Sequence, residues 1–121
     1  MNQLKKGYDL EARTLKFSSE LIDYCKKCTK DTITIPLINQ LIRYGTSIGA
    51  NYREANGASS KKDFQNKIFI CKKEAKETLY WIELMGKAIN NEKLIKELRK
   101  LWQESKELTL IFSKIAHSTK N

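Results

Sequence analysis

The sequence predicts an all-α protein, an antiparallel up-down-up-down four-helix bundle formed by one domain over residues 1–121. Apolar residues recur at spacings of three and four along almost the whole chain, which is the period of an α-helix. The chain contains a single proline, and only short stretches interrupt this period. Short connections favour antiparallel neighbours. We expect the helices at about residues 9–29, 36–56, 60–89 and 92–116.

The first helix is expected to bury one apolar face. That face consists of Leu10, Phe17, Leu21, Tyr24 and Cys28. Residues 30–35 then break the helical period, and their Thr-Ile-Thr-Ile alternation is too short to form a sheet without another candidate strand. We therefore expect a connection there, followed by Pro36 in the first turn of the next helix.

The second helix carries few charges, so we expect it to be the most enclosed of the four. Its charged side chains are Arg43, Arg53 and Glu54. Its predicted core face consists of Leu37, Leu41, Tyr44, Ile48, Tyr52 and Ala55. Gly45 and Gly49 are four residues apart and therefore share a face, where they permit another helix to approach closely. Gly57 fits the end of this helix.

The third and fourth helices have clear start signals. Ser60 is expected to cap the third helix, with Asp63 completing a variant of the capping box. The core stripe of the third helix is Phe64, Ile68, Cys71, Ala75, Leu79, Ile82, Met85 and Ile89. Asn90 and Asn91 mark a tight break before the fourth helix. Its stripe is Leu94, Leu98, Leu101, Ser105, Leu108, Phe112 and Ile115.

The composition excludes several classes of protein. Hydrophobic residues make up 40% and charged residues 31% of the chain, so it is neither low-complexity nor collagen-like. No apolar run approaches the roughly 20 residues that span a bilayer, so no membrane segment is expected. Lys5 and Lys6 precede no apolar stretch, so we expect no signal peptide. With an odd count of three cysteines, a reducing cytoplasmic location is expected.

The third helix has a second apolar group away from its core stripe. This group consists of Ile70, Tyr80, Trp81, Leu84 and Ala88. One stripe suffices for a monomeric bundle, and exposed aromatic residues are enriched in interfaces. We therefore predict a homo-oligomer with this group in its interface. The alternative is a wide core stripe with a few tolerated surface residues.

The formal net charge of +9 is spread over the chain, with a modest concentration on the third helix and at the termini. Five lysines of the third helix fall within an arc of about 100°. They are Lys62, Lys72, Lys73, Lys76 and Lys87. We interpret them as a stripe that contacts the phosphates of RNA or DNA, interrupted by Glu83. The alternative is an ordinary solvated lysine face.

No pattern predicts catalysis, a cofactor or a metal site. Cys25 and Cys28 form a C-x-x-C pair that Cys71 and His117 could in principle complete, but no second closely spaced ligand pair exists. Cys28 lies on the core stripe, where cysteine acts as a small apolar residue. No Ser-His-Asp set or phosphate-binding glycine loop is present. We expect a non-enzymatic protein, and small polar groups such as Asn51 are expected to form hydrogen bonds across helices or subunits.

Three segments resemble a known family. They are Ser47-Ile-Gly-Ala-Asn-Tyr-Arg-Glu-Ala55, Ser60-Lys-Lys-Asp-Phe64 and Lys73-Glu-Ala-Lys-Glu-Thr-Leu-Tyr-Trp81. They are similar to the four-helix-bundle proteins encoded in intervening sequences of bacterial 23S ribosomal RNA genes, often labelled S23 ribosomal proteins. The family motif residues are Ser47, Ile48, Ala50, Asn51 and Glu54. Gly49 stands where the family often has proline.

The resemblance implies a homopentamer with no established enzymatic activity. Distantly similar accessory proteins of diversity-generating retroelements form basic pentameric barrels that bind nucleic acid and a polymerase. Binding of RNA or DNA is therefore expected from the resemblance as well as from the lysines. The alternative function is an oligomeric scaffold for a protein partner, with no role in nucleic-acid binding.

Overall fold

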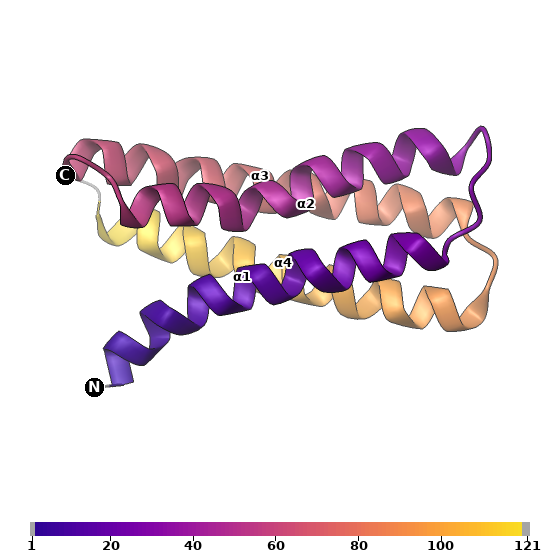
Figure 1. Cartoon of the computed structure of the whole chain (residues 1–121), viewed down its shortest axis with the longest axis horizontal. Helices are drawn as coiled ribbons and strands as arrows, with labels where there is room; N and C mark the ends of the chain where they lie inside the picture. The colour runs from indigo at the N-terminus through magenta and orange to yellow at the C-terminus, as the bar shows by residue number, and fades with distance from the viewer. Residues whose placement is uncertain (1, 120–121) are drawn as a thin grey trace.

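The computed structural model describes the backbone of residues 2–119 and the side chains of residues 10–119. Within this range the chain forms four helices and no strand, which confirms the all-α class. The helices are α1 (Asn2–Lys27), α2 (Thr34–Asn56), α3 (Lys61–Ala88) and α4 (Glu92–Ser118). They lie side by side, and consecutive helices run in opposite directions (Figure 1). No helix in the described part of the chain is long and apolar enough to cross a membrane.

Helix α1 begins seven residues before the predicted start at residue 9, at Asn2. The apolar stripe begins only at Leu10, so the pattern could not reveal the earlier turns. Once a helix has formed, each residue added to its end gains one backbone hydrogen bond, so α1 can extend beyond its apolar stripe. Its other end is satisfied by the ammonium of Lys30, which donates to the carbonyl oxygens of Cys25 at 2.7 Å and Cys28 at 2.8 Å. The Cys25 carbonyl lies in the last turn of α1, where carbonyl groups lack partners within the helix, and Cys28 follows the helix end.

Helix α2 also begins earlier than predicted, at Thr34 instead of residue 36. Asp31 explains the difference, because one of its carboxylate oxygens accepts from the backbone N–H of Thr34 at 2.9 Å. In return, the Thr34 hydroxyl oxygen accepts from the backbone N–H of Asp31 at 3.0 Å. This reciprocal pair is a capping box formed by aspartate and threonine. The alternating Thr and Ile residues therefore belong to a helix start.

The starts of α3 and α4 agree with the sequence. The Ser60 hydroxyl accepts from the backbone N–H of Asp63 at 3.0 Å, so the predicted N-cap is confirmed. The Asn91 side chain accepts from the backbone N–H of Leu94 at 2.9 Å and caps α4. Helix α4 continues two residues beyond the predicted end, to Ser118.

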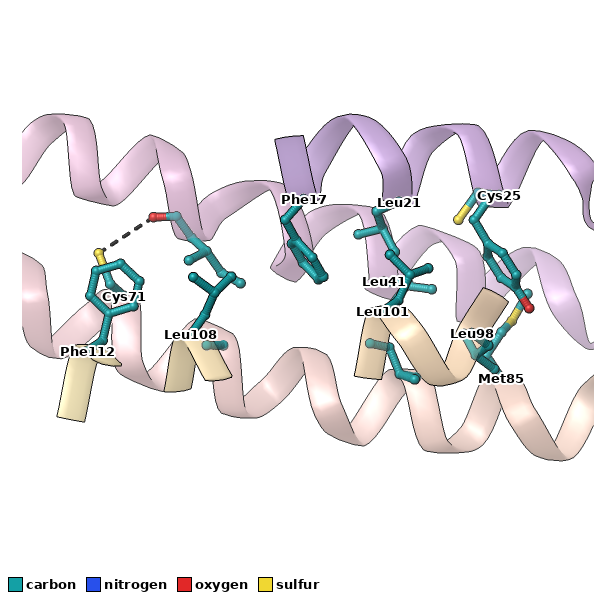
Figure 2. Close-up of a cluster of buried hydrophobic side chains, with 14 of the residues drawn as sticks. Phe17, Leu21, Cys25, Leu41, Cys71, Met85, Leu98, Leu101, Leu108 and Phe112 are labelled. Carbon is teal, nitrogen blue, oxygen red and sulfur yellow. Dashed lines mark hydrogen bonds between the residues drawn. The ribbon is translucent and has the colours of Figure 1, made fainter. Parts of the chain in front are cut away.

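Most residues of the predicted apolar stripes meet in one core. Tyr44 of α2 and Leu79 of α3, which were also predicted to lie there, are only partly buried, and Thr78 of α3 is fully buried. Figure 2 shows part of the core, including Phe17 and Leu21 of α1, Leu41 of α2, and Leu108 and Phe112 of α4.

Helix α3 packs against both α2 and α4, and it is the most extensively packed helix. Helix α2, which was expected to be the most enclosed, buries six of its 23 residues, compared with six of 28 in α3. The outer face of α2 is poor in charge but still open to solvent, as the 46% exposure of Ile35 shows.

Helices α1 and α4 meet along a polar seam. The Arg13 guanidinium makes two hydrogen bonds to Glu104, at 2.6 and 2.8 Å, and a third to Glu107 at 2.7 Å. Lys27 pairs with Glu97 at the other end of this seam. Hydrogen bonds from Gln103 and Arg13 hold the pKa of Glu107 below its ordinary value of 4.5. The contact between the first and last helices therefore depends on charge as well as on apolar packing.

This seam predicts a specific loss of stability in acid. Glu107 has a lower pKa in the folded chain than in the unfolded chain. Its contribution is therefore complete above about pH 4.5 and is lost as the pH falls through the folded value. We expect the thermal midpoint to fall with pH in this acid range. The fall should be shallower in Arg13→Gln, which keeps a polar side chain without the cation. Thermal unfolding followed by circular dichroism between pH 3 and pH 7 measures both slopes, and parallel slopes would contradict the prediction.

Candidate nucleic-acid interface

Three of the five predicted lysines lie close together on α3. Lys72, Lys73 and Lys76 line an open hollow of about 450 Å³, together with Phe69 and Glu77. Lys76 is four residues after Lys72 and three after Lys73, so it neighbours both on one side of the helix. Glu77 is the single acidic residue of this lining. The hollow is therefore a concentrated basic surface.

The other two predicted lysines lie far from this hollow. Lys62, in the first turn of α3, lies about 15 Å along the helix axis from Lys72, and Lys87, in the last turn, lies about 17 Å from Lys76. Lys62 and Lys87 are both exposed. All five lysines lie on the same side of the helix by their angular positions. Their spacing along the axis, however, divides the predicted stripe into a cluster of three lysines and two separate ones.

Glu83 was expected to interrupt the lysine stripe, and the structure gives its carboxylate a partner. The indole N–H of Trp102 on α4 donates to Glu83 at 3.0 Å. This contact directs the carboxylate toward the junction of α3 and α4. Glu83 also does not line the hollow of Lys72, Lys73 and Lys76.

Phe69 is a surface residue outside the predicted lysine stripe and the predicted apolar groups. Its side chain is 61% exposed, and the Lys72 ammonium lies 5.7 Å from the centre of its ring. A second hollow of about 350 Å³ shares these two residues and extends to α4. The rest of its lining is Gln65, Asn66, Ser113, Ala116 and His117. Its spacing could have indicated this position, because Phe69 precedes Lys72 and Lys73 by three and four residues and is therefore their neighbour on the helix surface.

The second apolar group of α3 is divided between the surface and the bundle. Tyr80 is 54% exposed, whereas Ile70, Leu84 and Ala88 are partly buried. Trp81 packs against the core of its own chain, and the centre of its ring lies 5.0 Å from that of Tyr80 in an edge-to-face arrangement. Further exposed apolar side chains lie on α1 and at the start of α2. They are Leu15, Ile22, Ile33 and Ile35.

The family motif residues of α2 make contacts that support the fold. The Ser47 hydroxyl donates to the carbonyl oxygen of Tyr44, and the Asn51 amide donates to that of Ser47, each at 2.8 Å. Both bonds lie within α2, and among the side chains of residues 10–119 neither residue forms the expected bond to another helix. Glu54 pairs with Lys67 of α3 at 2.7 Å.

The other two motif residues differ in burial. Ile48 is fully buried, and its carbonyl oxygen accepts from the Cys71 thiol at 3.6 Å (Figure 2). Ala50 is exposed.

The cysteines belong to the core. Cys25, Cys28 and Cys71 are all buried, which confirms the interpretation of Cys28 as a core residue. Burial raises the pKa of the Cys25 and Cys71 thiols to about 12. His117 is exposed and lines the second hollow. Among the residues that the structure describes, no three metal-binding side chains come together.

The fold and its motif match a known family over most of the chain. The model of the 23S rRNA-intervening sequence protein family matches residues 8–112. A similar solved structure is the crystal structure, at 1.70 Å resolution, of a protein with unknown function from the S23 ribosomal protein family of Bacteroides thetaiotaomicron VPI-5482. The two chains have a TM-score of 0.80 and 32% sequence identity, over 93% of this chain and 98% of that chain. Comparison with curated proteins finds no match. The resemblance seen in the sequence is thus confirmed, and the chain belongs to the 23S rRNA-intervening sequence protein family.

Proposed function

We propose that this protein is a non-enzymatic homopentamer that binds the phosphate backbone of nucleic acid through the cluster of Lys72, Lys73 and Lys76. The observation that carries this proposal is the hollow that these lysines share, with Glu77 as its single acidic residue. Lysine binds phosphate as a point charge and reads base edges poorly. The binding is therefore weakly dependent on sequence and strongly dependent on salt, because each phosphate contact releases counterions.

A closed ring needs two different surfaces on each protomer, because its contacts run head to tail. The chain offers two candidates. One is the exposed part of the second apolar group of α3, centred on Tyr80, and the other includes Leu15 and Ile22 of α1. Within residues 2–119, α1 contacts α2 and α4 but not α3, so these two helices occupy diagonal positions in the bundle. Their outer faces therefore lie on different sides of the bundle and can serve as the two unlike surfaces of a head-to-tail contact.

Assembly into a ring increases the contribution of the positive charge to nucleic-acid binding. A monomer of net charge +9 is an ordinary basic protein, whereas five copies in a ring repeat the lysine cluster around one particle. Several clusters then contact one nucleic-acid chain, and the second contact is made at a high effective concentration. Weak contacts at single clusters therefore add to useful affinity without any base-specific hydrogen bond.

Neutralising the lysine cluster is expected to weaken binding about tenfold at about 50 mM salt. The variant replaces Lys72, Lys73 and Lys76 by glutamine. A matched control replaces Lys16, Lys26 and Lys96, which are exposed and lie on α1 and α4. The control should lose less than about threefold, because it changes only the general field of the protein. Fluorescence anisotropy with RNA and duplex DNA across a salt series measures both losses.

Two results would contradict the proposal. Equal losses in the two triple variants would mean that the cluster has no special role, and no binding near 50 mM salt would reject nucleic acid altogether. Light scattering behind a sizing column tests the assembly on the same preparations. A clean monomer at micromolar concentration would exclude the ring. An intact oligomer without nucleic-acid binding would favour the alternative of a scaffold for a protein partner.

A further inference from the structure

We propose that Phe69 is a stacking platform for an unpaired base, and that the site therefore selects single-stranded RNA or DNA over duplex. This inference rests on the proposed function, because the same lysine cluster supplies the phosphate contacts. It adds the class of nucleic acid, and it assigns a role to an aromatic residue that the phosphate contacts do not explain.

The position of Phe69 is unusual for an apolar side chain. It is 61% exposed, and it lines both hollows of this surface. On one side lie Lys73 and Lys76, and on the other lie Asn66 and His117. The Phe69 ring contacts the Lys72 ammonium and still leaves most of its surface to solvent. A ligand that carries both a flat aromatic group and a negative charge matches both features.

Base stacking on Phe69 and phosphate binding by the lysines can occur together within one site. The Lys72 ammonium lies 5.7 Å from the centre of the Phe69 ring. A nucleotide that stacks its base on the ring therefore has its phosphate within reach of Lys72, with Lys73 one position further along the helix. The hollows of about 450 and 350 Å³ fall in the size range of small-molecule sites, so they have space for nucleotide units.

A duplex cannot use the ring. Its bases are paired and stacked on each other, so their faces are closed to a protein side chain. A single strand offers its bases, and stacking on an aromatic side chain tolerates any sequence because every base has a flat aromatic face. The lysines alone would bind either form through phosphate. Phe69 is therefore the residue that distinguishes them.

The test replaces Phe69 by alanine, leucine and tryptophan in the full chain. A matched control is Leu110→Ala on α4, which is also an exposed apolar residue, at 57%. The probes are oligouridine RNA, oligothymidine DNA and a mixed-sequence DNA duplex of equal length. Alanine and leucine should each reduce affinity for both single strands by about fivefold to tenfold, whereas tryptophan should retain it. Affinity for the duplex should change less than about twofold in every variant.

Salt dependence separates this inference from the proposed function. The slope of affinity against salt should stay unchanged in Phe69→Ala, because stacking releases few ions, and it should fall in the triple lysine variant. Full single-strand affinity in Phe69→Ala, or an equal loss on the duplex, would overturn the stacking role and leave phosphate binding by the lysines intact. Failure of the unaltered protein to bind any probe would overturn both. Retention by tryptophan but not by leucine excludes a role for bulk alone.

Discussion

Replacing Phe112 by alanine should lower the free energy of unfolding by about 3–5 kcal/mol. The Phe112 ring is fully buried, and its centre lies 5.6 Å from that of Tyr52 in a tilted arrangement. It comes from α4, whereas Tyr52 comes from α2, so the pair crosses the bundle between helices that are not adjacent. Alanine leaves a cavity at this crossing that rigid helices cannot close. Chemical unfolding followed by circular dichroism measures the loss.

Leu110→Ala, two residues away, is the control that tests whether burial causes the loss of stability in Phe112→Ala. Leu110 lies on the same helix but is 57% exposed, so Leu110→Ala should change stability by no more than about 0.5 kcal/mol. Both variants need measurement at several protein concentrations, because assembly adds to the apparent stability. A loss below about 1 kcal/mol in Phe112→Ala, or similar losses in the two variants, would be inconsistent with a core position for Phe112.

The second large effect is expected at Gly45, where α2 approaches α1. A Cβ atom added there would lie 2.1 Å from Cδ2 of Leu21, which is fully buried and has little room to move. Alanine improves helix propensity by about 0.5–1 kcal/mol. Overpacking a filled core costs about 1–3 kcal/mol and occasionally more. Because the clash is severe, we expect Gly45→Ala to destabilise the protein by about 2 kcal/mol in the same unfolding experiment.

Gly86 provides the matched comparison. A Cβ atom there would meet Cδ2 of Leu98 at 3.6 Å, which is an ordinary van der Waals distance. Gly86→Ala should therefore keep the gain in helix propensity and stabilise the protein by about 0.5 kcal/mol. The two glycine substitutions are chemically identical but should have opposite signs. Stabilisation at both positions would show that backbone propensity outweighs the approach of α1, and destabilisation at both would contradict the ordinary contact at Gly86.

Local sequence predicted the core because helical periodicity is a property of neighbouring residues. The stripe from Leu10 to Cys28 is buried as expected, and Ser60 caps α3 as expected. The predicted start of α2 was wrong because a side-chain hydrogen bond forms in the stretch that interrupts the helical period. The Asp31 side chain starts α2 within a stretch that alternates like a strand, and such a capping box depends on the conformation of the connection.

The candidate site was predicted in part. Periodicity placed Lys72, Lys73 and Lys76 on one side of α3. It gives the angular position of each side chain around its own helix axis, but it does not predict contacts with other helices. It could not show that Phe69 stays exposed, because the burial of a residue at the edge of a stripe depends on where α4 lies. It also could not show that Trp102 holds Glu83, which is a contact between residues of two helices.

The sequence by itself determined the helical class, the buried stripes and the distribution of charge, because each depends on the spacing of residues within a single segment. The tertiary structure alone decided which lysines form a cluster, which apolar residues remain exposed and how closely α1 and α2 approach at Gly45. These features depend on the distances between helices, and those distances are set by the packing of side chains that are far apart in the chain.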